Sequence, residues 1–190
     1  MPQRAVVLCL AIVACLALAA TALMRAPGQA SRSAASAVTP LPADAGVLQP
    51  GDPIPTLRGE PVLRIRGLGG AQALRLDIAA LDRMPQVEVT LDEPFVGRSM
   101  TFTGVPFADF VEITGIPAGA RLEMSALDDY SVDLAVADLV DGNAVLATRT
   151  DGQELAVDGG GPTRLVFASP TGVGANSDNW IWSIETIEVR

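Results

Sequence analysis

The segment FTGVPFADFVEITG, residues 102–115, predicts a strand that runs directly into a helix. Pro106 suits the first turn of a helix, because its fixed φ is helical and its missing N–H is not needed there. Gly115 suits the end of that helix, where chains commonly turn left-handed. We therefore expect a strand up to Val105 and a short helix after it. The side chains expected in the core are Val105, Phe107, Phe110, Val111 and Ile113.

Short strands dominate the sequence on both sides of this segment. Residues 62–68, VLRIRGL, alternate apolar and basic side chains as a half-buried strand does, so the arginines should face water. Asp77 is placed to cap a short helix that ends at Pro85. Further strands are expected at 86–91, 99–105, 121–126, 130–134, 144–149, 154–157, 164–168 and 180–189, with a helical turn over 136–139. Strand clusters with short helices indicate a single α+β domain of mixed, mainly β sheets.

The first 55 residues are expected to lie outside this domain. Arg4 and the apolar run over 5–24 predict a signal peptide or an N-terminal membrane anchor at 1–25, and the sequence leaves open which of the two it is. Residues 26–55 are rich in Ala, Ser, Pro and Gly and have no hydrophobic period, which predicts a flexible linker. The domain should then cover 56–190. We expect an exported protein, periplasmic or otherwise extracytoplasmic.

The composition excludes several kinds of chemistry. With 13 arginines, no lysine and 22 acidic residues, the formal net charge is −9, so nucleic acid is excluded as a partner because its phosphates require basic side chains. The chain has no histidine, and both cysteines, Cys9 and Cys15, lie in the apolar leader. The exported body therefore has no thiolate or imidazole ligand, and no Ser–His or Cys–His pair for nucleophilic catalysis. Any metal would have to be held by carboxylates alone.

Five segments, in order, carry a resemblance to a known family. FTGVPFADFVEITG resembles the Trp/Phe-Thr-Gly-Val-Pro-Leu-x-Asp-Leu-Leu-x-x-x-Gly segment of the sulfite-oxidase-like, molybdopterin-binding domains. SALDDYSVDLAVADL, NAVLATRTDGQEL, GGGPTRLVF and NWIWSIETIEV follow in the order and at about the spacing of that family. The likeness is greatest to its small exported members, which lack the molybdenum-ligand cysteine. It implies a sulfite-oxidase-like fold and makes molybdopterin the one cofactor to consider.

The chain also departs from the pattern of the cofactor-bearing members. There a cysteine before the Thr-Gly-Val-Pro segment holds molybdenum, whereas residues 89–99 here read VTLDEPFVGRS and contain no sulfur. A family His-Gly pair ahead of Pro-x-Arg corresponds to Gly159 and Gly160, although Arg164 is kept, and a family lysine corresponds to Asn179. These changes favour a noncatalytic domain without a cofactor. The alternative is a molybdopterin-dependent oxidoreductase, so the sequence leaves open whether the chain is an enzyme.

The candidate ligand-binding cleft follows from the same segments. By the resemblance, Arg164 would pair with the anionic group of a small ligand. The amides of residues 159–161 could form a concavity for that anion, or the glycine triplet could be a turn or bulge that enters the next strand. The residues expected to line the cleft are Gly159, Gly160, Gly161, Arg164, Tyr130, Asp128, Asn179 and Trp180. The expected partner is a small anionic ligand or a membrane or periplasmic protein, in a sensory or accessory role.

Two of these elements also have purely structural interpretations. Asp128 and the adjacent acid could share acid–base work, but Asp128 could equally cap a turn that leaves Tyr130 half-buried with its hydroxyl bonded. Trp180 and Trp182 are two residues apart, so on a strand they share one face and form either a stacking platform or part of the core. The sequence does not choose between these alternatives.

Overall fold

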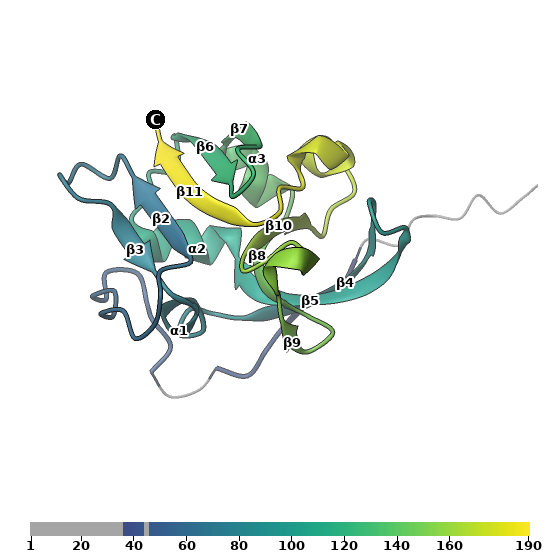
Figure 1. The fold of residues 1–190 in the computed structure, drawn as a ribbon, viewed down its shortest axis with the longest axis horizontal. Coiled ribbons are helices and arrows are strands. Elements are labelled where there is room, and N and C mark those ends of the chain that lie inside the picture. The colour runs from purple at the N-terminus through teal and green to yellow at the C-terminus, as the bar shows by residue number, and fades with distance from the viewer. Residues whose placement is uncertain (1–35, 44–45) are drawn as a thin grey trace, which may run out of the picture. The chain divides into compact units, whose positions relative to one another are not determined.

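Residues 36–43 and 46–190 are described by the computed structural model of the protein, and they form two β-sheets with short helices (Figure 1). The first sheet has the strand order β1-β4-β5-β8-β10, which are Val38–Pro40, Val87–Glu93, Arg98–Pro106, Ala144–Thr150 and Arg164–Phe167, and β9, Gln153–Glu154, pairs with β8. The second has the order β3-β2-β11-β6-β7, which are Leu74–Leu76, Leu63–Arg66, Ile184–Val189, Arg121–Ala126 and Ser131–Ala135. The predicted α+β class with mainly β sheets is confirmed.

The helices are short and connect the strands. They are α1, Ile78–Leu81; α2, Phe107–Thr114; and α3, Val136–Asp141. Three 3-10 helices follow, namely η1, Val157–Gly159; η2, Gly172–Ala175; and η3, Ser177–Asn179. The predicted cap at Asp77 is confirmed, because its carboxylate accepts from the Ala80 N–H at 2.8 Å. None of the helices in the described residues is long and apolar enough to cross a membrane.

The segment over 102–115 folds as its residues predict. β5 passes into α2 at Pro106, and α2 ends at Gly115, whose φ of 75° is left-handed. Gly104 is needed for a different reason, since a Cβ there would lie 2.2 Å from the carbonyl oxygen of Leu146 on β8. The register of the β5–β8 pair shifts at this point, between Thr103 and Gly104. Glycine therefore lets the two central strands come together just before the helix begins.

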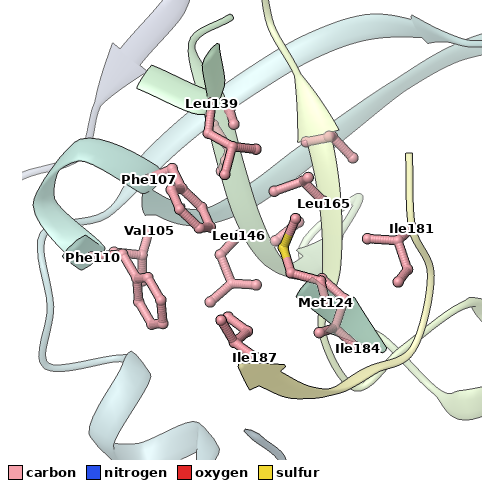
Figure 2. Packing of buried hydrophobic residues seen from close by; sticks show 14 of the residues in the cluster. Val105, Phe107, Phe110, Met124, Leu139, Leu146, Leu165, Ile181, Ile184 and Ile187 are labelled. Atoms are coloured by element: carbon pink, nitrogen blue, oxygen red, sulfur yellow. The ribbon is translucent and has the colours of Figure 1, made fainter. Parts of the chain in front are cut away.

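The core lies where side chains of the two sheets and α2 meet (Figure 2). The contributing side chains come from β5, β8 and β10 on one side and from β6 and β11 on the other, with those of α2 beside them: Val105, Leu146, Leu165, Met124, Ile184, Ile187, Phe107 and Phe110. All five core residues predicted from the segment over 102–115 are buried. Removal of this apolar surface from water is the main force that holds the sheets together.

The structure differs from the expected linker over 26–55. β1 pairs with β4 in antiparallel register, with Val38 opposite Val89. Leu48 is 3% exposed and its N–H donates to the Arg83 carbonyl at 2.7 Å. An edge strand offers unpaired backbone groups, and a short segment satisfies them without any hydrophobic period in its own sequence. Within the described part of 26–55, β1 is thus hydrogen-bonded to the domain and Leu48 is buried against it. The predicted leader over 1–25 lies outside the described residues.

Two predicted strands are wrong over part of their length. The strand expected at 180–189 begins only at Ile184, and the strand expected at 154–157 ends at Glu154, before η1. Ile181 accepts from the Leu165 N–H of β10 at 2.9 Å, whereas residues from Ile184 onward pair with the second sheet. Residues 180–183 therefore cross from one sheet to the other and are not extended strand. The Trp-x-Trp spacing cannot predict such a crossing, because it shows only which side chains would share a face if the segment were a strand.

Candidate functional site

A pocket of about 320 Å³ lies beside the end of β6, and eight residues line it. They come from the β4–β5 turn, the end of β6 and its following turn, η3, and the crossing segment before β11: Phe95, Ala126, Asp128, Tyr130, Ser177, Asp178, Trp180 and Trp182. Four of them are aromatic and two are acidic. Within the described chain, none of the lining residues is basic.

The turn after β6 forms one wall. The Asp128 carboxylate accepts from the Tyr130 N–H at 3.1 Å, and the Tyr130 hydroxyl donates to the Asp178 carbonyl at 2.7 Å. The turn-cap interpretation is confirmed for Asp128. Tyr130 has the expected bonded hydroxyl, but at 44% it is exposed and not half-buried as predicted. The Tyr130 hydrogen bond therefore joins this turn to η3 at one edge of the pocket.

Trp180 belongs to both the core and the pocket. Its indole N–H donates to the Gly174 carbonyl at 3.0 Å, and its ring centroid lies 5.8 Å from that of Phe167. The side chain is 7% exposed. The remaining accessible part lines the pocket. Trp180 therefore presents a rigid aromatic surface whose orientation is fixed by the core.

Trp182 separates the pocket from a buried arginine. Its ring centroid lies 5.6 Å from that of Phe95, with the two planes at 88°. On the Arg164 side, the guanidinium carbon lies 4.2 Å from the Trp182 ring centroid. This distance is typical of a cation–π interaction. The indole Nε1 of Trp182 is buried and has no hydrogen-bond partner in the described structure.

Arg164 is paired inside the protein. Its guanidinium donates to a Glu93 carboxylate oxygen at 2.6 Å, and both side chains are essentially inaccessible, at 1% and 0% exposure. The other oxygen of Glu93 accepts from the Phe95 and Val96 N–H groups. Burial lowers the pKa of Arg164 and the Glu93 carboxylate opposes this, but an arginine remains charged at neutral pH. An internal carboxylate therefore neutralises the guanidinium that the sequence assigned to an anionic ligand.

Close packing requires glycine at two positions of the triplet, Gly160 and Gly161. Gly160 has a φ of 86°, and a Cβ there would lie 2.8 Å from the Trp182 ring. A Cβ on Gly161 would lie 2.1 Å from the Leu155 carbonyl oxygen, whereas one on Gly159 would meet nothing within 4 Å. The three amide N–H groups donate to the carbonyls of Ala156 and Val157. They are not free to cradle an anion, so the turn interpretation of the triplet is the one the structure supports.

The predicted cleft is therefore divided into two places. Asp128, Tyr130 and Trp180 line the pocket together. The triplet over 159–161 and Arg164 lie behind Trp182 and do not line it. Asn179 also lies outside the lining, since its amide donates to the Val173 carbonyl at 2.8 Å and links η3 to η2.

The residues present do not fit the cofactor implied by the resemblance. Within 36–43 and 46–190, no three His, Cys, Asp or Glu side chains are grouped so as to hold a metal ion. In the region over 89–99, the Thr90 hydroxyl is hydrogen-bonded to the Thr101 hydroxyl at 2.8 Å, and the Glu93 carboxylate accepts a hydrogen bond from Arg164. A soft metal would find no sulfur ligand there. A phosphate bound in the pocket would meet Asp128 and Asp178 and no basic side chain among the lining residues.

Sequence reasoning missed Glu93, Phe95 and Trp182 as parts of this site. A signal for Glu93 exists, since β4 buries every second residue from Val87 onward and that alternation places Glu93 inward. An acid at an inward position indicates a buried partner. No pattern predicts that Phe95 and Trp182, far apart in the sequence, come within contact, because only the fold brings the β4–β5 turn to the crossing segment.

Comparisons with known proteins agree on one family and one fold. The family model described as "Oxidoreductase molybdopterin binding domain" matches residues 51–190. Among solved structures, the crystal structure of the sulfane dehydrogenase SoxCD from Paracoccus pantotrophus is similar, with a TM-score of 0.51 and 19% sequence identity. The match covers 67% of this chain and 37% of that chain, and at this identity it supports the fold alone. No match was found among curated proteins.

Proposed function

The chain belongs to the oxidoreductase molybdopterin-binding domain family, and from that premise we propose that it is an exported, noncatalytic member that binds a small ligand in the pocket beside Tyr130. The apolar leader of the sequence supports export. The absence of cysteine and histidine from residues 26–190 supports a role without metal chemistry. A sensory or accessory role beside a membrane or periplasmic partner protein fits this assignment.

The buried Arg164–Glu93 pair carries the proposal. In the cofactor-bearing members, the resemblance assigns the matching arginine to an anion of the site. Here both members of the pair are buried, and Trp182 closes over the guanidinium from the pocket side. Drawing Glu93 away from Arg164 would break a buried ion pair and leave the Glu93 carboxylate without its counter-charge, which is unfavourable. An anionic ligand would have to overcome that cost before it reached the guanidinium.

The pocket supports ligand binding without catalysis. Its volume of about 320 Å³ is in the range of small-molecule sites. Its aromatic walls are held by the Tyr130 and Trp180 hydrogen bonds, so the surface exists before any ligand arrives. Of the described residues that line it, only Asp128 and Asp178 carry carboxyl groups, and the Asp128 carboxylate already accepts from the Tyr130 N–H of its own turn. The arrangement therefore favours holding a ligand over transferring a proton to it.

A molybdopterin-dependent oxidoreductase is the second candidate, favoured by family membership itself. Molybdenum analysis separates the two candidates. The full chain would be purified from a host with an intact molybdenum-cofactor pathway, beside a molybdoenzyme made in the same host as the loading control. We expect molybdenum far below one atom per chain when the control is fully loaded. A stoichiometric content would overturn the noncatalytic assignment.

A further inference from the structure

The charge and the aromatic content of the pocket wall select one class of ligand. Asp128 and Asp178 are the charged lining residues, and no ion pair neutralises either of them within the described part of the chain. Phe95, Tyr130 and Trp180 add aromatic rings to the same wall. Ring faces carry negative electrostatic potential and attract cations, so the rings and the carboxylates favour the same sign of charge.

Arg164, which lies against Trp182, does not offset this preference. Arg164 lies behind Trp182, at 4.2 Å from its ring centroid, and is neutralised by Glu93 at 2.6 Å. With the pair buried, its net field at the pocket is that of a dipole and falls off faster than that of a free charge. The formal net charge of the whole chain, −9, acts in the same direction as the lining carboxylates.

Two of the aromatic rings are held in place by hydrogen bonds. Tyr130 is held to the Asp178 carbonyl, and Trp180 to the Gly174 carbonyl. Phe95 packs edge-on against Trp182, which in turn covers Gly160. Fixed rings lose little conformational entropy on binding, which favours a compact ligand with an apolar surface. The volume of about 320 Å³ accommodates a group of quaternary-ammonium size.

We infer that this pocket binds a small organic cation with an apolar body, of the quaternary-ammonium class, through its aromatic rings and the carboxylates of Asp128 and Asp178. The inference rests on the proposed binding function and names its ligand class. It replaces the anionic ligand expected from Arg164 by a ligand of the opposite charge, because that guanidinium faces Glu93 and not the pocket.

Tryptophan fluorescence offers a direct test. The chain has only two tryptophans, and both line the pocket, so a bound ligand changes the emission of the whole chain. The full chain would be titrated with choline and with 3,3-dimethylbutan-1-ol, a neutral compound of nearly the same shape. We expect saturable choline binding at least roughly fivefold tighter than that of the neutral compound, the difference expected of one cation–π contact. Equal affinities would overturn the inference, as would the absence of a saturable response to choline.

Variants that lack the two pocket carboxylates provide a second test. The double variant Asp128→Asn and Asp178→Asn keeps the acceptor for the Tyr130 N–H and the backbone carbonyl that receives the Tyr130 hydroxyl. We expect it to weaken choline binding roughly fivefold or more, because the attraction between the cation and two carboxylates is lost, and to leave binding of the neutral compound unchanged. The control, Glu112→Gln with Asp141→Asn, removes the same charge from exposed positions that do not line the pocket. An equal loss in both double variants would contradict a local role for the pocket carboxylates.

The outcomes distinguish this inference from the function on which it rests. If the neutral compound or a small anion such as acetate binds the pocket more tightly than choline, the inferred ligand class is wrong, but the proposed noncatalytic binding function is not contradicted. If the purified chain carries stoichiometric molybdenum, the binding function itself fails. A Tyr130→Ala variant that keeps its far-ultraviolet circular dichroism and its midpoint of urea unfolding, yet binds choline as tightly as the unchanged chain, would overturn the role of the rings.

Discussion

At the residue scale, Glu93 is the side chain on which the site depends most. One carboxylate oxygen accepts from Arg164 at 2.6 Å, and the other accepts from the backbone of the β4–β5 turn that carries Phe95. The same acid therefore neutralises the buried guanidinium and positions one ring of the pocket. A buried ion pair adds little stability compared with an apolar pair of the same shape, but removal of one partner is costly.

Replacement Glu93→Gln tests this dependence. The amide keeps the size of the side chain but leaves Arg164 buried without a counter-charge, so we expect the free energy of unfolding to fall by about 3–5 kcal/mol. Urea unfolding, monitored by tryptophan fluorescence, measures this fall in the free energy of unfolding. The control is Glu123→Gln, which removes a carboxylate paired with Arg190 at the exposed surface, where the expected loss is at most about 1 kcal/mol. Losses of similar size in the two variants would show that burial does not determine how much stability the Arg164–Glu93 pair contributes.

At the element scale, α1 is a short helix that depends on its cap. The Asp77 carboxylate is 3% exposed and accepts from the N–H groups of Arg58, Gly59 and Ala80. Burial acts to raise the pKa of Asp77, but the hydrogen bonds from these backbone groups outweigh it, and the net pKa is lowered from 3.8. Asp77 therefore joins the start of α1 to the chain before β2, and it does so in its charged form.

The lowered pKa of Asp77 predicts a stability loss in acid. Since the folded-state pKa lies below the unfolded value of 3.8, the contribution is complete above pH 3.8 and is lost as the pH falls through the folded-state pKa. Asp77→Asn should lose about 1 kcal/mol at pH 7, because the amide keeps only one of the two oxygens that accept from backbone N–H groups, and it should show a flatter fall below pH 4. Urea unfolding at a series of pH values measures both. Asp141→Asn is the control, and parallel curves for the Asp77 variant and the unchanged chain would contradict the assignment.

The elements that the sequence predicted are those whose residues have a local reason for their structure. Gly115 and Asp77 act through their own backbone or side-chain chemistry and are found where they were expected. Pro106 lies just before the predicted place, as the N-cap residue of α2 and not within its first turn. β1 and the crossing at 180–183 were not predicted, because both depend on pairing with distant strands. The site follows the same division. The Tyr130 turn was predictable from neighbouring residues, whereas the Arg164–Glu93 pair joins positions 71 residues apart.

At the scale of the whole molecule, the excess of acidic residues determines how the chain responds to salt. A formal net charge of −9 on 190 residues creates repulsion that favours the unfolded chain at low ionic strength. The exposed ion pairs, such as Arg121–Asp133 and Arg149–Asp82, act in the opposite direction and are also weakened by salt. Because each exposed pair contributes little, the repulsion should dominate.

Salt should therefore stabilise the fold and weaken the binding of a cation. Between about 0.01 M and 0.15 M sodium chloride the Debye length falls from about 30 Å to about 8 Å, which screens the repulsion among exposed carboxylates. We expect the free energy of unfolding to rise by on the order of 1 kcal/mol, while choline binding at Asp128 and Asp178 becomes weaker. Urea unfolding and fluorescence titration at matched salt measure the two effects, with sodium sulfate at equal ionic strength as the control for specific ions. A fold that lost stability as salt rose would show that the ion pairs outweigh the net charge, and choline binding that did not change with salt would argue against an electrostatic contribution to the pocket.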